Sequence, residues 1–280
     1  GFFYPLTVVA DCTDDMLLVK EEQFGPAIPV IKYKTVEEAI ARANAYVESA
    51  VHARGEDLAA LDAVVKKAAP VRALDMGSGG GHVAYLLARH AKSVAAVDLS
   101  AEMLAAVADT AKAKELANIE THRASVERLP FADGSFDLVA SRYSAHHWHD
   151  FDGGLKEARR VVKPGAPVIL MDVFTPGMAL LDTHLQSVEL LRDTSHVRNY
   201  TMAEWTQALA RAGLTLKKAY TWRLYLEFDS WIARMRTPEV FARAIRALQA
   251  GASKEVRDHF AIKEDGSFTI DTMMLETMAD

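Results

Sequence analysis

The chain of 280 residues contains very little cysteine and no excess of basic residues. Its one cysteine, Cys12, has no second cysteine to pair with, which excludes a disulfide within the chain and a zinc site made of several thiolates. With 32 basic and 38 acidic residues, the net charge is -6. This charge argues against a dedicated nucleic-acid-binding protein, because such proteins usually display a basic face.

The sequence also lacks the features of export and of membrane insertion. No apolar run approaches the length of a membrane span. The first residues, GFFYPLTVVADC, have no basic region, are interrupted by Pro5, and place Asp11 where a lipid-modified cysteine needs a small neighbour. We therefore predict a soluble cytoplasmic protein whose partner is a small-molecule substrate, without nucleic acid and without a membrane span.

Between Val71 and Phe174, short apolar runs alternate with amphipathic stretches. The apolar runs predict buried strands over residues 71–76, 93–98, 118–123, 135–142 and 166–174. The amphipathic stretches predict three helices. The first ends near residue 89, the second covers 100–116 with Ser100 as its N-cap, and the third covers 151–163. This alternation predicts an α/β fold with a doubly wound, mostly parallel sheet, in which ligands bind at the carboxyl ends of the strands.

A different pattern follows Phe174. Residues 202–214 predict a helix that ends at Gly213. Two alternating runs, TLKKAYTW (215–222) and RLYLEF (223–228), predict an antiparallel hairpin that closes the sheet. The remainder from Asp229 predicts mostly helix.

A glycine-rich turn follows the first of these strands. Asp75, Gly77, Gly79 and Gly81 form D-x-G-x-G-x-G, and Asp98 ends the next strand about twenty residues later. Glycines let the backbone turn tightly and approach a ligand closely, and the second acid suits a ribose diol.

The cofactor that fits this turn is not a dinucleotide. A dinucleotide site wants a glycine or alanine at the position of His82, and Asp75 would repel a pyrophosphate. Asp75 instead suits a ligand with an ammonium group. S-adenosyl-L-methionine (SAM) has an ammonium group and a ribose diol but no phosphate, so it fits the turn best. A nicotinamide-dependent oxidoreductase is the second interpretation of the sequence.

Four segments, VRALDMGSGGGH, VAAVDLSAEML, ERLPFADGSFDLVASRYSAHHWHD and EARRVVKPGAPVILMD, resemble the class I SAM-dependent methyltransferases. AYVESAVHARGEDL, RDTSHVRNYT and SWIARMRTPE resemble more narrowly the YafE-type bacterial methyltransferases, which are close to the quinone-biosynthesis C-methyltransferases. The resemblance implies a seven-stranded Rossmann-like sheet with helical C-terminal additions, and SAM as the cofactor. It also implies these cofactor-binding residues: Tyr46, Asp75, Gly77, Gly79, Gly81, Asp98, Leu99, Met103, Ser125, Val126 and Ser141.

Three histidines, His146, His147 and His149, lie within four residues after the fourth predicted strand. A metal site is not expected, because no cysteine accompanies them and helical metal pairs stand four residues apart. His147 and His146 are the candidate catalytic residues, either as a base with a pKa suited to neutral pH or as residues that only pack and orient.

The irregular stretch SHVRNYT offers the substrate-contact candidates His196, Arg198 and Tyr200. Arg198 could hold an anionic group of a substrate. Trp231, Arg234 and Met235 stand at helical spacing and predict core packing with a charged edge.

Residues 1–44 resemble part of the catalytic domain of NAD(P)-dependent aldehyde dehydrogenases, in which the phrase matching Glu22 and Phe24 contacts the nicotinamide. That chemistry needs a cysteine nucleophile and a cofactor domain, and Cys12 lacks the setting of that nucleophile. We therefore predict two parts: a non-functional dehydrogenase-like fragment over 1–44 and a methyltransferase domain over 45–280. A third interpretation is a SAM-binding protein without turnover.

Overall fold

The computed structural model describes residues 7–9, 27–29 and 55–280. The chain divides into two units, residues 1–41 and 42–280. In the first unit, β1 (Thr7–Val9) pairs in parallel with β2 (Ala27–Pro29). Most of the dehydrogenase-like segment, including Cys12, Glu22 and Phe24, lies outside the described residues, as does Tyr46.

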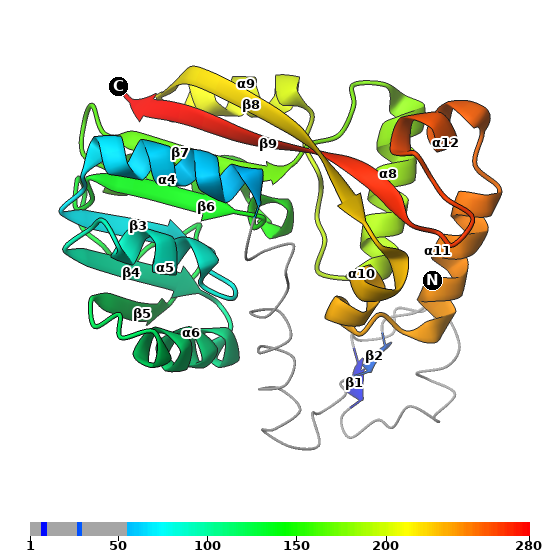
Figure 1. The fold of residues 1–280 in the computed structure, drawn as a ribbon, viewed down its shortest axis with the longest axis horizontal. Coiled ribbons are helices and arrows are strands. Elements are labelled where there is room, and N and C mark those ends of the chain that lie inside the picture. Colours follow the sequence, from blue (N-terminus) through cyan, green and yellow to red (C-terminus); the bar gives the residue numbers. More distant parts are fainter. Residues whose placement is uncertain (1–6, 10–26, 30–54) are drawn as a thin grey trace. The chain divides into compact units, whose positions relative to one another are not determined.

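The second unit contains a seven-stranded sheet with the order β5-β4-β3-β6-β7-β9-β8 (Figure 1). Its parallel strands are β3 (Arg72–Met76), β4 (Ser93–Asp98), β5 (Ile119–Arg123), β6 (Leu138–Arg142) and β7 (Pro167–Val173). The chain moves outward from β3 to β5 and then returns to place β6 on the other side of β3. The predicted doubly wound sheet is therefore confirmed, and its switch point lies between β3 and β6.

Helices cover both faces of this sheet. On one face, α4 (Glu56–Ala68), α5 (His82–Ala88) and α6 (Ala101–Ala113) bury side chains such as Leu61 and Val107 in one apolar core. On the other, α7 (Phe151–Val161) and α9 (Met202–Ala212) contribute Leu155 and Trp205 to a second core.

Two predicted helix ends are confirmed. The Oγ of Ser100 accepts a hydrogen bond from Met103 N at 3.1 Å and caps α6. Gly213 ends α9 with a left-handed φ of 74°.

The predicted hairpin over residues 215–228 is wrong. One strand, β8 (Leu214–Leu226), runs through both segments and pairs antiparallel with β9 (Phe268–Ala279), which itself pairs antiparallel with β7. No glycine, proline or asparagine stands near Arg223 to turn the chain, so the alternation continues. The C-terminal β9 thus lies between β7 and the edge strand β8, although the sequence predicts mostly helix from Asp229.

The far halves of β8 and β9 extend beyond the sheet into a layer of helices (Figure 1). This layer contains α8 (Ala179–Arg192), which was not predicted, and α10 (Phe228–Met235), α11 (Glu239–Ala250) and α12 (Lys254–Phe260). A third apolar core holds it together, with Trp231 against Phe268 at 4.9 Å between ring centroids. Val173, the last residue of β7, belongs to the same core, so the helical layer stands at the carboxyl end of the sheet.

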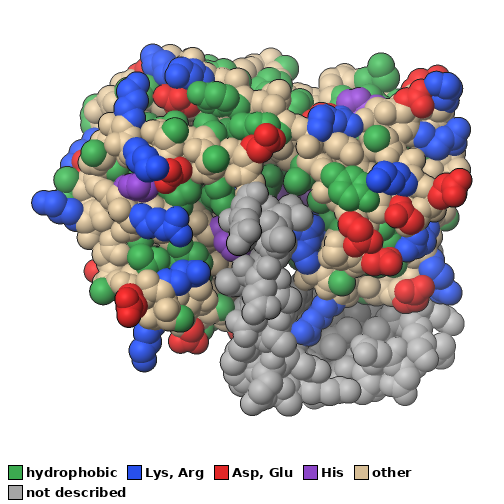
Figure 2. Space-filling model, viewed as in Figure 1, with side chains coloured by type: hydrophobic (Ala, Val, Ile, Leu, Met, Phe, Trp, Pro, Cys, Tyr) green, Lys and Arg blue, Asp and Glu red, His purple; other side chains and the backbone are tan. Residues whose placement is uncertain are grey.

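On the face drawn in Figure 2, basic and acidic side chains are interspersed rather than gathered into one basic surface. Within the described part of the chain, no helix combines the length and the apolar character that a membrane crossing requires.

Candidate functional site

The glycine-rich turn is joined to the neighbouring strand. Backbone N–H groups of Gly77 and Ser78 donate to the carbonyl of Val97 at 2.9 and 2.8 Å. Gly77, Gly79 and Gly81 have φ values of 74°, 47° and 78°, which side chains disfavour. A Cβ on Gly77 would also lie 1.9 Å from the Oγ of Ser144. The first glycine is therefore required both by its conformation and by a close neighbour.

Asp98 holds this turn from the end of β4. Its Oδ2 accepts from Gly79 N at 2.8 Å and its Oδ1 from Ser100 N at 2.9 Å. An ionised carboxylate offers about four acceptor positions, so each oxygen retains capacity for a ligand hydroxyl. Leu99 follows with 65 % of its surface exposed, and Met103 lies half-buried in the first turn of α6.

Asp75 is buried at the end of β3, with 1 % of its surface exposed. Its Oδ2 accepts from Ala84 N at 2.9 Å. Burial raises the pKa of Asp75 to about 7, and the charge of Asp98 acts in the same direction. Asp75 lines a pocket of about 260 Å³ together with Ser78, Gly80, His82, Val83, Arg142 and Tyr143. A cationic ligand group placed there would favour the ionised carboxylate.

The other predicted cofactor residues are placed differently. Ser125 Oγ accepts from Glu127 N at 3.2 Å and donates to a carboxylate oxygen of the same residue at 3.4 Å, so its hydroxyl is engaged in its own turn. Val126 is buried in the core beside Gly77. Ser141 is buried in β6, and its hydroxyl has no hydrogen-bond partner among the described residues.

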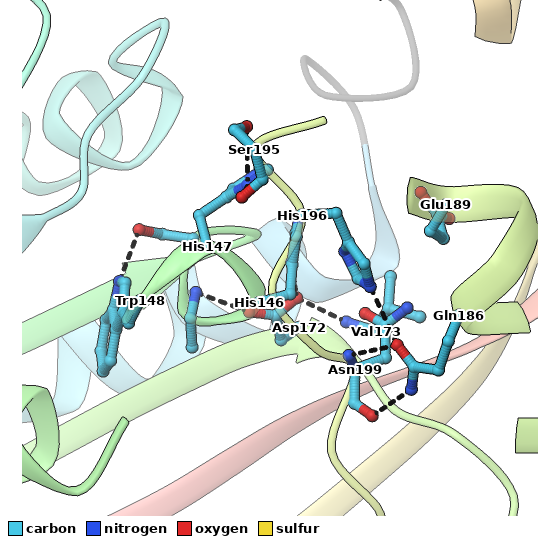
Figure 3. A network of polar contacts seen from close by, with 12 residues as sticks. His146, His147, Trp148, Asp172, Val173, Gln186, Glu189, Ser195, His196 and Asn199 are labelled. Carbon is cyan, nitrogen blue, oxygen red and sulfur yellow. Dashed lines mark hydrogen bonds and ion pairs between the residues drawn. The ribbon is translucent and has the colours of Figure 1, made fainter. Parts of the chain in front are cut away.

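A group of histidines forms at the carboxyl ends of β6 and β7. The short 3-10 helix η1 (Ala145–His147) places His146 Nδ1 2.6 Å from Asp172 Oδ1. The ring of His146 lies 4.2 Å from that of His147 and 5.7 Å from that of His196, measured between centroids. Figure 3 shows the three histidines around Asp172, with Gln186 and Asn199 beside His196. Over residues 55–280, no group of these residue types has the arrangement of a metal site.

The three histidines differ in basicity. Burial alone would lower the pKa of His146, but the charge of Asp172 and its hydrogen bond outweigh burial and raise it. Burial and the charge of His146 lower the pKa of His147 to about 4. Burial, and to a smaller extent the charge of His146, lowers the pKa of His196 to about 3. His146 is therefore the histidine of this group whose pKa is raised, whereas the pKa values of its two neighbours are lowered.

A larger pocket of about 590 Å³ opens beside His146. It lies between the sheet end, α8, α10 and the extended parts of β8 and β9. Its lining residues are Tyr143, His146, His147, Val173, Glu189, Arg192, Asp193, Asn199, Leu224, Leu226, Trp231, Arg234, Met235 and Ile270. Tyr143 lines this pocket and the pocket of Asp75, so the two spaces adjoin at its side chain. Its φ of 49° is unusual for a residue with a side chain, and such strain is often found at functional sites.

None of the three predicted substrate residues lines this pocket. Arg198 pairs with Asp182 at 3.1 Å and with Glu204 at 3.4 Å. Tyr200 stacks on Phe151 with 3.9 Å between ring centroids. His196 does approach the site, through its ring contact with His146.

Several residues of the site were not predicted. Asp172 interrupts the apolar run VILMDVF, and an acid in a buried strand is a signal that sequence reasoning could have used. Glu189 carried no such signal, because its place depends on how α8 packs. Asn199 belongs to the irregular stretch SHVRNYT, from which substrate contacts are expected. Trp231 is buried as predicted, and it lines the pocket together with Arg234 and Met235.

Comparison with known families gives two matches. The profile described as a methyltransferase domain matches residues 74–170. The profile of the aldehyde dehydrogenase family matches residues 1–53, which extends past residue 44, the predicted end of that segment.

Individual proteins match over most of the chain. YafE of Escherichia coli, an uncharacterised protein, is 50 % identical over 196 residues, or 70 % of this chain and 95 % of YafE. YcgJ of Bacillus subtilis, an uncharacterised methyltransferase, is 34 % identical over 220 residues, or 79 % of this chain and 87 % of YcgJ. Its crystal structure aligns with a TM-score of 0.76 at 30 % identity, covering 80 % of this chain and 97 % of that one. The quinone-biosynthesis C-methyltransferase UbiE of Geotalea daltonii is 34 % identical over 120 residues, or 41 % of this chain and 51 % of UbiE.

Proposed function

We propose that this chain, which belongs to the class I SAM-dependent methyltransferases in the group of YafE and YcgJ, transfers the methyl group of SAM to a small molecule in the pocket beside His146. The observation that carries the proposal is the juxtaposition of the glycine turn, Asp98 and the buried Asp75 at the switch point of the sheet. The adjoining pocket provides a place for the methyl acceptor.

The residues of the turn fit SAM. Gly77, Gly79 and Gly81 would let the backbone approach the methionine end, and Asp75 would face its ammonium group. Asp98 would accept hydrogen bonds from the ribose hydroxyls, with Leu99 and Met103 beside the adenine. When bound, SAM supplies a methyl group on a positively charged sulfur, which leaves as a neutral thioether.

His146 would remove the proton that the acceptor atom loses as it gains the methyl group. Its Nδ1 faces Asp172, and Nε2 has no hydrogen-bond partner among the described residues. A histidine whose pKa is raised by a carboxylate that also orients its ring suits this step. His147, whose pKa is lowered to about 4, would pack and orient rather than transfer protons. Alignment of acceptor and sulfonium would supply the rest of the acceleration.

Calorimetric titration of the full chain with SAM, with NAD in parallel, tests the cofactor assignment. We expect saturable binding of SAM, no binding of NAD, and loss of SAM binding in Asp98→Ala, because the ribose then loses its acceptor. Asp109→Ala, which removes an exposed carboxylate on α6, is the matched control and should bind SAM normally. NAD binding without SAM binding would refute the proposal. SAM binding without methyl transfer to any acceptor would favour a SAM-binding protein without turnover.

The affinity for SAM should rise as the pH increases towards neutrality. In the free protein the pKa of Asp75 is about 7, and the ammonium group of SAM would lower it. Below that pH, binding of SAM would therefore release a proton from Asp75. Between pH 6 and pH 7 the dissociation constant should fall about fivefold, following the ionised fraction of Asp75. Above about pH 7.7–8.0 an α-amino group loses its own proton, so affinity should be highest between these limits.

Titrations in buffers of different ionisation enthalpy would count the released proton. Asp75→Asn should bind SAM more weakly and lose the rise between pH 6 and pH 7. A rise that persists in Asp75→Asn would assign the pH dependence to another group.

A further inference from the structure

We propose that the methyl acceptor carries a hydrogen-bond donor and a hydrogen-bond acceptor on neighbouring ring atoms, and that Asn199 recognises this edge. The inference rests on the proposed function, because it takes the pocket beside His146 as the acceptor site.

The side chain of Asn199 is buried without partners. Only 1 % of the residue is exposed, and neither Nδ2 nor Oδ1 has a hydrogen-bond partner among the residues that the structure describes. Both atoms are shielded from solvent, so bulk water does not satisfy them. Most buried polar groups in proteins have a partner, and an unsatisfied one in a native structure requires an explanation. Asn199 lines the pocket beside His146, where a ligand could supply both bonds.

The backbone of Asn199 is held firmly. Gln186 accepts from Asn199 N at 3.0 Å and donates to its carbonyl at 2.7 Å. The Oε1 of Gln186 also lies 2.9 Å from His196 Nε2 (Figure 3). The amide of Gln186 is thus fully engaged in positioning a neighbour whose own amide has no partner. This arrangement is typical of a recognition group that is positioned before the ligand arrives.

The geometry of the amide defines what it can recognise. A primary amide presents an N–H donor and a carbonyl acceptor side by side, which is how asparagine reads the donor and acceptor on one edge of adenine. The complementary edge is a cyclic amide, or a hydroxyl next to a carbonyl.

The rest of the pocket indicates an acceptor without net charge. Glu189 is buried and pairs with Arg192 at 3.5 Å, and His146 is paired with Asp172. The two remaining charged lining residues, Asp193 and Arg234, have opposite signs. The apolar wall consists of Tyr143, Val173, Leu224, Leu226, Trp231, Met235 and Ile270. The acceptor class is therefore a neutral, largely apolar ring compound with one amide-like edge, and Met235 is flexible enough to give way as it enters.

Two probes test this recognition on the full chain saturated with S-adenosylhomocysteine, which binds without transferring a methyl group. Quinolin-2(1H)-one has an N–H next to its carbonyl, and N-methylquinolin-2-one has lost that donor. We expect the first to bind on the order of tenfold more tightly, because the second leaves Oδ1 of Asn199 buried and unpaired. Calorimetry or ligand-observed NMR would measure the ratio.

Asn199→Leu, which has nearly the same shape, supplies a second measurement. It should bind the two probes with equal affinity, and it should unfold at a higher urea concentration than the unmodified chain, because two unpaired polar atoms are removed. Leu224→Ala is the control, since it should weaken the binding of both probes by the same factor. Equal affinity in the unmodified chain, or no detectable binding of the quinolinone, would overturn the inference. So would an Asn199→Leu variant that is less stable and still discriminates.

These outcomes are separable from those of the proposed function. Failure of the cofactor to bind the same sample would refute the methyltransferase assignment. The ratio between the two probes can be measured with or without the cofactor, and it reports on Asn199 alone.

Discussion

Replacing Gly77 with alanine is expected to weaken SAM binding by on the order of 100-fold, or about 2.7 kcal/mol, the scale of one or two lost hydrogen bonds to a charged ligand. The new Cβ would stand 1.9 Å from the Oγ and 2.7 Å from the Cβ of Ser144. Ser144 cannot move freely, because its Oγ accepts from Trp148 Nε1 at 3.0 Å. The turn itself must therefore shift away from the ligand. Calorimetric titration with SAM measures the loss.

Gly165→Ala is the matched control. Gly165 has the same φ of 74°, but a Cβ there would meet nothing within 4 Å. Both variants carry the strain of a left-handed alanine, about 1–2 kcal/mol, and only Gly77→Ala carries the collision. Gly165→Ala should therefore bind SAM with unchanged affinity. If Gly77→Ala also binds SAM normally, the glycine turn is not the element that holds the cofactor.

Replacing Asp57 with alanine should lower the free energy of unfolding by about 3–5 kcal/mol, as expected when one partner of a buried ion pair is removed. Asp57 accepts from Arg142 through two bonds, at 2.6 Å from Nε and 3.1 Å from Nη2. Both side chains are nearly inaccessible, with 5 % of Arg142 and 6 % of Asp57 exposed. The variant would leave a guanidinium group buried without this carboxylate, beside the ring of Tyr143. Urea denaturation gives the change.

The control for this variant is Asp152→Ala. Asp152 pairs with Arg211 at 2.8 Å, but 53 % of the arginine side chain is exposed. An exposed pair contributes at most about 1 kcal/mol, so this variant should unfold almost like the unmodified chain. Equal losses in the two variants would mean that the buried pair does not hold α4 to the end of β6.

The resemblance of short segments was informative about the proposed cofactor site, because its residues are close together in the chain. The glycines, Asp75 and the cap of α6 each depend on residues only a few positions away. Asp98 follows from its place at the end of the next strand, since adjacent parallel strands end at the same edge. The alternation of apolar and amphipathic segments was sufficient for the parallel part of the sheet.

The proposed acceptor site depends on contacts between distant segments. The bond between His146 and Asp172 joins residues 26 positions apart, and its carboxylate decides which histidine is basic. Adjacent His146 and His147 look alike in sequence, yet Asp172 raises the pKa of His146, whereas burial and the charge of His146 lower that of His147. Likewise, the alternation in β8 was visible, but its partner β9 lies more than forty residues further on and could not be identified from the pattern.

The sequence by itself thus determined the fold class, the strands β3 to β7 and the residues of the turn, because periodicity, capping and glycine conformation are properties of neighbouring residues. Only the tertiary structure decided the pocket beside His146, the antiparallel closure of the sheet and the unpaired amide of Asn199. Those features arise where α8, α10, β8 and β9 meet the ends of β6 and β7. Their burial and charge are set by packing between segments, which no local pattern encodes.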